Sequence, residues 1–180
     1  GEGLVLAQSS FEQAGYAGLP YVEQEAAAVL GGARGARVPL AELDPDRLSE
    51  LGQSGGLARY DWLHFATHAY AEPVTGTFTG LLVGRGVLDV QAIRRWRLTA
   101  RLVTLSACQT GVGRWHYGDE IAGLTQAFIS AGAQSVVASL WLVQDESTAT
   151  LMAAFYRALG EGQSPAAALA TAQRAAHRAG

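Results

Sequence analysis

Two residues with reactive side chains follow short apolar runs of the sequence. His68 comes two residues after Trp62–Ala66, and Cys108 follows the run Leu102–Leu105. A thiol attacks well only as the thiolate, and a neighbouring imidazole is the commonest group that keeps it in this form. If both runs are strands, the two residues leave the carboxyl ends of those strands and could meet at one edge of a sheet. Cys108 would then be a nucleophile and His68 its general base, both at a loop edge.

Cys108 is the only cysteine, which excludes an internal disulfide and a Cys-rich zinc site. It could still be an inert buried residue, an intermolecular thiol or a nucleophile. Its surroundings, Ser106–Gly111, are small and polar, and the glycine can relieve a tight turn where the chain leaves the strand. The backbone N–H of Cys108 could point into the crevice as half of an oxyanion hole. Chemistry and position alone leave the inert and the reactive interpretations equally open.

His64 competes with His68 for the role of base. In an extended strand residues 64, 66 and 68 point to one face, and His64 lies roughly 13 Å back from His68 along the strand. We therefore interpret His64 as a buried, hydrogen-bonded core histidine and His68, at the strand exit, as the base. His116 and His177 are interpreted as solvated residues of a loop and a helix.

The rest of the chain alternates expected strands with expected helices. The strands are Leu4–Ala7, Trp62–Ala66, Gly80–Val83, Leu102–Leu105 and Ser135–Trp141, the last expected to be covered on both faces. The helices are Tyr21–Leu30, Pro45–Leu51 with Asp44 as its cap, Leu88–Trp96, Ile121–Ala131, Asp145–Leu159 and a last one from Ser164-Pro165. Residues 9–20 and 70–80 are expected loops. The order predicts right-handed crossovers and a three-layer α/β/α sandwich around a mostly parallel sheet, with ligands beyond the carboxyl ends of its strands.

Composition narrows the functional classes. The 180 residues are 49% hydrophobic and 16% charged, which is typical of one globular domain. The net charge of −3 and the absence of a long basic run give no electrostatic reason to expect nucleic-acid binding. No apolar run approaches the roughly 18 residues that span a bilayer, and the first residues of the sequence do not show a signal-peptide pattern. We expect no membrane partner, a cytoplasmic location, and, because the sequence opens with Gly-Glu-Gly, a piece of a longer protein.

Three blocks of the sequence resemble the core blocks of CHAT domains: Leu63–Ala69, Leu105–Gly111 and Ala133–Trp141. Segments Leu19–Ala26, Asp145–Thr150 and Ser164–Arg174 fit the same pattern, so the resemblance covers nearly the whole chain. CHAT domains are grouped with caspases, gingipains and separases, and many occur in bacterial proteins behind tetratricopeptide or other interaction repeats. The resemblance implies a caspase-like fold and a cysteine endopeptidase. Residues 1–180 would be the peptidase domain, lacking part of the family's amino-terminal portion.

The resemblance also implies roles for individual residues. Cys108 and His68 become a catalytic dyad, and the backbone N–H groups of Cys108 and Ala69 form the oxyanion hole. Caspases usually have glycine at the position of Ala69, a departure that leaves the backbone donor intact. Asp145 resembles the acid with which separases hold a basic residue, although helix capping also explains it. Trp141 either walls the same substrate pocket or packs in the interior.

The implied chemistry needs no cofactor and no metal. The implied partners are a protein substrate and a regulatory repeat region or activating partner protein. Three other functions stay open: a catalytically inactive caspase-like scaffold that acts as a protein-interaction module, a thiol redox or acyltransferase enzyme, and a flavodoxin-like ligand binder. The redox alternative lacks a second, resolving cysteine. The flavodoxin alternative needs a phosphate-binding loop after the first strand, which Gly15–Gly18 resembles poorly.

Overall fold

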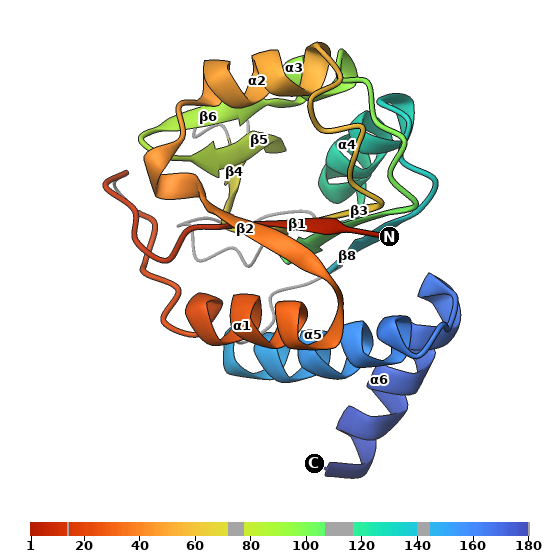
Figure 1. Ribbon diagram of the computed structural model, residues 1–180. Coiled ribbons are helices and arrows are strands. Elements are labelled where there is room, and N and C mark those ends of the chain that lie inside the picture. The colour runs from red at the N-terminus through yellow and green to blue at the C-terminus, as the bar shows by residue number, and fades with distance from the viewer. Residues whose placement is uncertain (14, 72–77, 107–116, 140–144, 180) are drawn as a thin grey trace.

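The fold centres on one parallel sheet. The computed structural model describes residues 1–13, 15–71, 78–106, 117–139 and 145–179 (Figure 1). Five strands, all paired in parallel, form the sheet in the order β2-β1-β3-β7-β8. They are β1 (Gly3–Ala7), β2 (Gly35–Pro39), β3 (Trp62–Ala66), β7 (Leu102–Ser106) and β8 (Val136–Ala138). The mostly parallel central sheet predicted from the sequence is confirmed.

The three inner strands read as continuous apolar runs because both of their faces are covered. Along β1, Leu4 and Leu6 belong to the core above the sheet, whereas Val5 and Ala7 belong to the core below it. This alternation is the period of an extended chain.

The expectation that the strand within Ser135–Trp141 is covered on both faces holds in part for its described residues. Val136 and Ala138 pack against the core above the sheet, and Val137 packs against the core below it. However, β8 is the last strand in the sheet order, and its residues are only half-buried.

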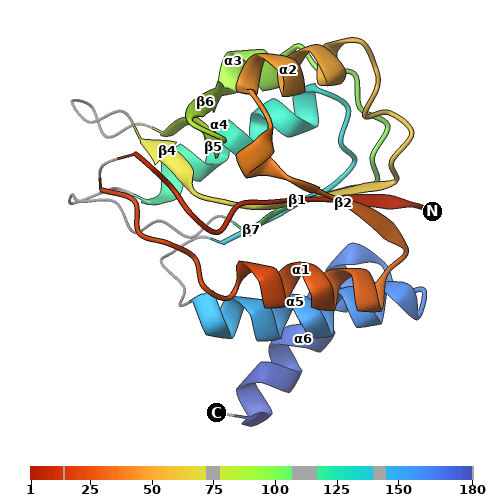
Figure 2. The ribbon, with the colours of Figure 1, turned by 60° about the vertical axis from the view of Figure 1, so that its left-hand side comes forward.

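Helices form the layer below the sheet in both ribbon views (Figures 1 and 2). They are α1 (Val22–Gly32), α5 (Asp145–Gly160) and α6 (Pro165–Ala179). Helices α1 and α5 lie side by side, and α6 projects away from the body of the molecule. Two glycines permit the close approach of α1 and α5, because a Cβ atom added at Gly160 would lie 2.1 Å from the carbonyl oxygen of Gly32. These two helices therefore cover one face of the sheet as a closely packed pair.

The layer above the sheet is mixed. Its helices are α2 (Pro45–Gln53), α3 (Val90–Arg94) and α4 (Tyr117–Ser130), with a short 3₁₀ turn η1 (Leu40–Glu42). Beside them lies a second, antiparallel sheet in the order β4-β5-β6, made of β4 (Ala69–Ala71), β5 (Phe78–Val83) and β6 (Gly86–Asp89). The three-layer α/β arrangement is confirmed, but the prediction missed this sheet and strand β2.

The second sheet corrects two expectations. The expected loop over residues 70–80 contains most of β4 and the start of β5. The expected helix Leu88–Trp96 begins only at Val90, because Leu88 and Asp89 finish strand β6. Asp89 is the helix cap instead, its carboxylate accepting from the backbone N–H of Gln91 at 2.6 Å. Apolar runs this short do not distinguish a strand from a helix by periodicity.

Other helix starts agree with the predicted signals. Asp44 caps α2 and accepts from the backbone N–H of Asp46 at 2.8 Å, and Pro165 is the first residue of α6. Within the described residues, none of these helices combines the length and apolar character needed to cross a membrane.

Candidate active site

Strands β3 and β7 are neighbours and end at the same edge of the sheet. Their parallel register pairs Ala66 with Ser106. His68 lies two residues beyond Ala66, and Cys108 follows Ser106 by the same number of residues in the sequence. Cys108 and Trp141 lie outside the described residues. Asp145 begins α5, as expected for a residue at a helix start, but its side chain is not described.

The His68 side chain is held by a backbone carbonyl. The ring is fully buried, and its Nε2 atom lies 2.8 Å from the carbonyl oxygen of Ala17. A carbonyl can only accept a hydrogen bond, so Nε2 carries the proton and donates. In the neutral ring Nδ1 is then the basic nitrogen. The contact therefore selects the tautomer and the direction from which His68 can take a proton.

Aromatic side chains hold the same ring from other directions. The ring centroids of Phe11 and Tyr16 lie 4.5 Å and 5.3 Å from that of His68, and Tyr16 stacks on Tyr70 at 6.4 Å. Phe11, Tyr16 and Ala17 all come from the segment that joins β1 to α1. The sequence predicts only a loop for this segment, and a backbone carbonyl has no residue-type signal by which its contact with His68 could be predicted.

The burial of His68 corrects one expectation. The sequence placed this residue at a loop edge, whereas none of its surface is exposed. The aromatic packing and the contact with Ala17 account for the burial. Truncating His68 to alanine would leave a cavity in addition to removing a base, so a residue of similar size is the better substitution.

The backbone at His68 and Ala69 is fixed by strand β5. The N–H of Leu82 donates to the carbonyl oxygen of His68 at 2.9 Å, and the Thr67 hydroxyl donates to the carbonyl oxygen of Leu82 at 2.8 Å. Ala69 lies opposite Leu81 in the β4–β5 ladder. The hydrogen bond from Leu82 makes His68 and Leu82 a hydrogen-bonded pair. Such pairs alternate with non-hydrogen-bonded pairs along an antiparallel ladder, so Ala69 and Leu81 are a non-hydrogen-bonded pair. The N–H of Ala69 therefore points away from β5.

His64 occupies a different environment within β3. Its side chain is fully buried; Nδ1 lies 3.1 Å from the Tyr156 hydroxyl, and Nε2 lies 3.1 Å from Oε1 of Glu25. The Tyr156 hydroxyl donates to the hydroxyl of Thr104 at 2.9 Å. The close approach of His64 and Glu25 lacks the alignment of a hydrogen bond, since neither of the two atoms has a hydrogen-bond partner. The prediction that His64 is a buried, hydrogen-bonded core histidine is confirmed.

Tyr156 is the phenol of this polar cluster, which we call the His64 cluster (Glu25, His64, Thr104 and Tyr156). Burial raises the pKa of Tyr156 well above its ordinary value, the hydrogen bond to Thr104 opposes this, and the charge of Glu25 reinforces it. The phenol therefore stays protonated in the folded protein. The cluster joins α1, β3, β7 and α5, and so it ties the lower helices to the sheet.

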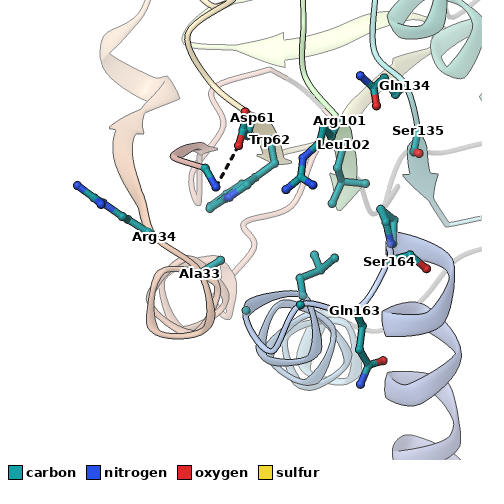
Figure 3. A pocket seen from close by; sticks show the side chains of 15 residues that line it. Ala33, Arg34, Asp61, Trp62, Arg101, Leu102, Gln134, Ser135, Gln163 and Ser164 are labelled. Atoms are coloured by element: carbon teal, nitrogen blue, oxygen red, sulfur yellow. Dashed lines mark ion pairs between the residues drawn. The ribbon is translucent and has the colours of Figure 1, made fainter.

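The pocket in Figure 3 lies at the opposite ends of the strands. Its volume is about 670 Å³, and its lining includes Trp62 and Leu102, the first residues of β3 and β7. An ion pair of 3.0 Å joins the Gly1 amino group to Asp61 in its wall (Figure 3). His68 and Ala69 do not line it. We therefore place the candidate site at the carboxyl ends of the strands, where the oriented histidine lies, and not in this pocket.

The described part of the chain holds no group of three or more His, Cys, Asp or Glu side chains arranged to bind a metal ion. Among the buried side chains it brings together three titratable residues of the His64 cluster, Glu25, His64 and Tyr156, and, separately, it holds His68 against its loop. Only His68 lies beyond a carboxyl end of the sheet, where sheets of this kind bind their ligands.

A parallel sheet between two layers that contain helices is the arrangement of a flavodoxin-like or caspase-like α/β sandwich. In this fold the oriented His68 lies past the carboxyl end of β3. The solved structure of a flavodoxin from Streptococcus pneumoniae superposes with a TM-score of 0.54, covering 91% of this chain and 100% of that one. At 12% identity this likeness shows the fold alone.

The family is shown by the sequence profile of the CHAT domain, which matches residues 1–179. The chain belongs to the CHAT family, which is related to the caspase-like cysteine peptidases, so the resemblance noted in the sequence is confirmed. Tetratricopeptide repeat protein 28 of mouse and of human are each 36% identical to it over 94 residues. The matched region is 52% of this chain and only 4% of the length of either relative.

Proposed function

We propose that this chain is a cysteine endopeptidase with Cys108 and His68 as its catalytic dyad. Nδ1 of His68 takes the thiol proton, and the thiolate attacks the peptide carbonyl carbon. His68 then gives the proton to the leaving amine, which departs as the thioester acyl-enzyme forms. Water attacks the thioester with His68 as base, and the bond to Cys108 breaks as the carboxylic acid leaves. No cofactor takes part.

The observation that carries the proposal is the contact between His68 and Ala17. A general base has to present its unprotonated nitrogen to the nucleophile. The Ala17 carbonyl oxygen, 2.8 Å from Nε2, keeps the proton on that atom and leaves Nδ1 basic. A histidine that served only to fill space would not need its tautomer fixed at the edge of the sheet where ligands bind.

Two further features support the same reaction. The register of β3 and β7 brings the strand ends before His68 and Cys108 to one level. The N–H of Ala69 points away from β5, which suits a donor to the oxyanion that forms in the tetrahedral intermediate. Membership of a family related to caspase-like peptidases agrees with a nucleophilic cysteine.

Covalent labelling tests the proposal. A peptidyl electrophile should modify Cys108 in the wild-type chain, and a peptide library should be cleaved. Cys108→Ala should abolish both reactions, and His68→Gln should slow both by about a hundredfold or more. If Cys108 reacts no faster than a free thiol, and cleavage does not depend on it, the chain is a scaffold and not a peptidase.

We further propose that Asp145 and Trp141 form part of the substrate pocket and that the pocket prefers a basic residue before the scissile bond. Support comes from the sheet order, because β8 adjoins β7 and leads toward the start of α5. Asp145→Asn keeps a helix-capping side chain, so a capping role predicts unchanged stability and turnover. The pocket role predicts a large loss on substrates with Arg or Lys and little on neutral ones. A wild-type cleavage profile without basic preference would contradict it.

The partners are proposals as well. We propose that residues 1–180 are the peptidase domain of a longer cytoplasmic chain and that a repeat region or partner protein activates it on a protein substrate. The name of the two mammalian relatives, tetratricopeptide repeat proteins, supports a repeat region as regulator. Turnover by residues 1–180 alone, compared with turnover by the longer chain, would test this: equal rates would exclude control by the repeats.

A further inference from the structure

We infer that Gln8 is a positioning residue for His68. The buried carboxamide of Gln8 locks the segment between β1 and α1, residues 8–21, to the turn between β5 and β6. We call this segment the β1–α1 loop. The catalytic consequence of this inference rests on the proposed function, whereas its effect on the His68 ring does not.

Gln8 forms a reciprocal pair with one residue of the β5–β6 turn. Its Oε1 accepts from the backbone N–H of Gly84 at 2.9 Å, and its Nε2 donates to the carbonyl oxygen of Gly84 at 3.0 Å. Nε2 also donates to the carbonyl oxygen of Ser10 at 2.9 Å. Only 4% of Gln8 is exposed, so water cannot readily replace these bonds. A carboxamide is the side chain that offers a donor and an acceptor together in this geometry.

The partner, Gly84, is suited to this contact for two reasons. Its φ angle of +56° lies in the left-handed region that favours glycine, and a Cβ atom there would lie 2.3 Å from the carbonyl oxygen of Leu43. The turn therefore packs closely against Leu43, the residue after η1, on one side and is hydrogen-bonded to Gln8 on the other. The β5–β6 turn can thus hold the β1–α1 loop in one position.

His68 has two supports, and Gln8 joins them. Strand β5 holds its backbone, through the hydrogen bond from Leu82 two residues before Gly84. The β1–α1 loop holds its ring, through the carbonyl oxygen of Ala17.

The ends of the β1–α1 loop are tied together and to the sheet. The N–H of Leu19 donates to the carbonyl oxygen of Ser9, the residue after Gln8, at 2.9 Å. The N–H of Gln8 donates to the carbonyl oxygen of Ala66 at 2.9 Å, which continues the ladder between β1 and β3.

The remaining freedom is the position of the loop relative to the turn after β5. Three contacts hold that position: the buried Gln8–Gly84 pair, a longer bond of 3.4 Å from Gln13 Nε2 to the same Gly84 carbonyl oxygen, and the exposed ion pair of 3.1 Å between Glu12 and Arg85. The Gln8–Gly84 pair is the buried and shortest of them, so it contributes most to fixing Ala17 relative to the His68 backbone.

The experiment replaces Gln8 with methionine, which keeps the length of the side chain and removes its donor and acceptor. Gln53→Met is the matched control, because it removes a side-chain hydrogen bond, from Gln53 Nε2 to the Ser49 hydroxyl at 2.8 Å, on helix α2. Nitrogen NMR of the ring reports the His68 tautomer without reference to activity, after assignment with His68→Gln. Peptide cleavage gives kcat and KM separately.

We expect wild type and Gln53→Met to show His68 protonated at Nε2 and Gln8→Met to show a mixture of tautomers. We also expect Gln8→Met to lower kcat by about tenfold or more with KM within about twofold, because a misplaced base slows the chemical step. Gln8→Asn keeps both the donor and the acceptor on a side chain shorter by one methylene, so it gives a smaller change in the same direction. It takes the place of Gln8→Met if that variant does not fold.

Two results would overturn the inference. One is an unchanged His68 tautomer and kcat in a folded Gln8 variant, and the other is an equal loss in Gln53→Met. If the wild-type chain cleaves no peptide, the proposed function fails, and the tautomer measurement alone decides the role of Gln8.

Discussion

His64 and His68 lie four residues apart on and just beyond one strand, and both are fully buried, yet they are held in different ways. His64 contacts the side chains of Glu25 and Tyr156, which come from two helices below the sheet. His68 contacts a backbone carbonyl and two aromatic rings, all from one loop beyond the end of the sheet.

The difference in partners indicates a difference in role. A carbonyl oxygen only accepts, so it fixes the His68 proton on one nitrogen. The Tyr156 hydroxyl gives its single proton to Thr104, so it accepts from Nδ1 of His64, and the His64 ring is held by a buried side-chain network on the lower face of the sheet. The cluster connects α1 and α5 to the sheet. Under the proposed function His64 contributes stability and His68 chemistry, and their equal burial does not separate the two roles.

The largest expected effect is on peptide turnover, when each of the two histidines is replaced in turn with glutamine. His68→Gln should lower peptide turnover by about a hundredfold or more, since glutamine cannot act as a base. His64→Gln should lower the free energy of unfolding by about 1–3 kcal/mol, because partners of the cluster lose a buried hydrogen bond, and turnover per folded molecule should stay near wild type. Urea denaturation and cleavage assays of both variants measure this. Loss of turnover in His64→Gln, with His68→Gln active, would show that the roles are reversed.

The sequence predicted the part of the site that follows from strand pattern. Trp62–Ala66 and Leu102–Leu105 read as strands because they are covered on both faces, and a parallel sheet fixes the edge at which both end. The position of His68 just past that edge followed directly. The burial of His68 did not, because it depends on the β1–α1 loop, whose conformation no periodic pattern describes.

The elements that the prediction missed are short or carry weak signals. Strand β2 has the sequence Gly-Ala-Arg-Val-Pro, and it contains both residues that usually interrupt strands. Strands β4 and β6 have three and four residues, too few for a period to be read. The Gln8–Gly84 contact joins residues 76 positions apart, and only the folded arrangement brings them together. Tertiary contacts of polar groups therefore account for most of what the sequence did not reveal about the site.

The next effect concerns the alkaline limit of stability, and it sharpens the structural role of the His64 cluster. The pKa of Tyr156 is raised by burial, so the folded protein keeps the phenol proton at pH values where the unfolded chain, with an ordinary tyrosine pKa of about 10, has lost it. This contribution to stability is fully present below about pH 10 and decreases as pH rises above it, by up to about 1.4 kcal/mol per pH unit. Tyr156→Phe should remove that slope and cost about 1–2 kcal/mol at neutral pH. Urea midpoints of both proteins from pH 8 to 11 measure the difference, and parallel curves would contradict the assignment.

The smallest expected effect concerns Glu23, an exposed residue on α1 two positions before Glu25 of the His64 cluster. Glu23 pairs with Arg37 at 2.6 Å, and more than half of its side chain is exposed, whereas Glu25 approaches His64 with 1% of the residue exposed. The hydrogen bond from Arg37 lowers the pKa of Glu23, and partial burial opposes this. Its contribution to stability is therefore present above the ordinary glutamate pKa of about 4.3 and is lost as pH falls through the lower folded value.

Solvent screening limits the value of such a pair, so Glu23→Gln should cost no more than about 0.5 kcal/mol at pH 7. The cost should disappear at acidic pH and in about 1 M salt, where the Debye length is only about 3 Å. Glu50→Gln, which removes the exposed partner of Arg47 on α2, is the matched control and should behave alike. Urea denaturation at low and high salt measures both variants. Glu23→Gln could instead lower the free energy of unfolding as much as His64→Gln does, at low and at high salt. That result would mean that the exposed and the buried pair on α1 contribute equally to stability.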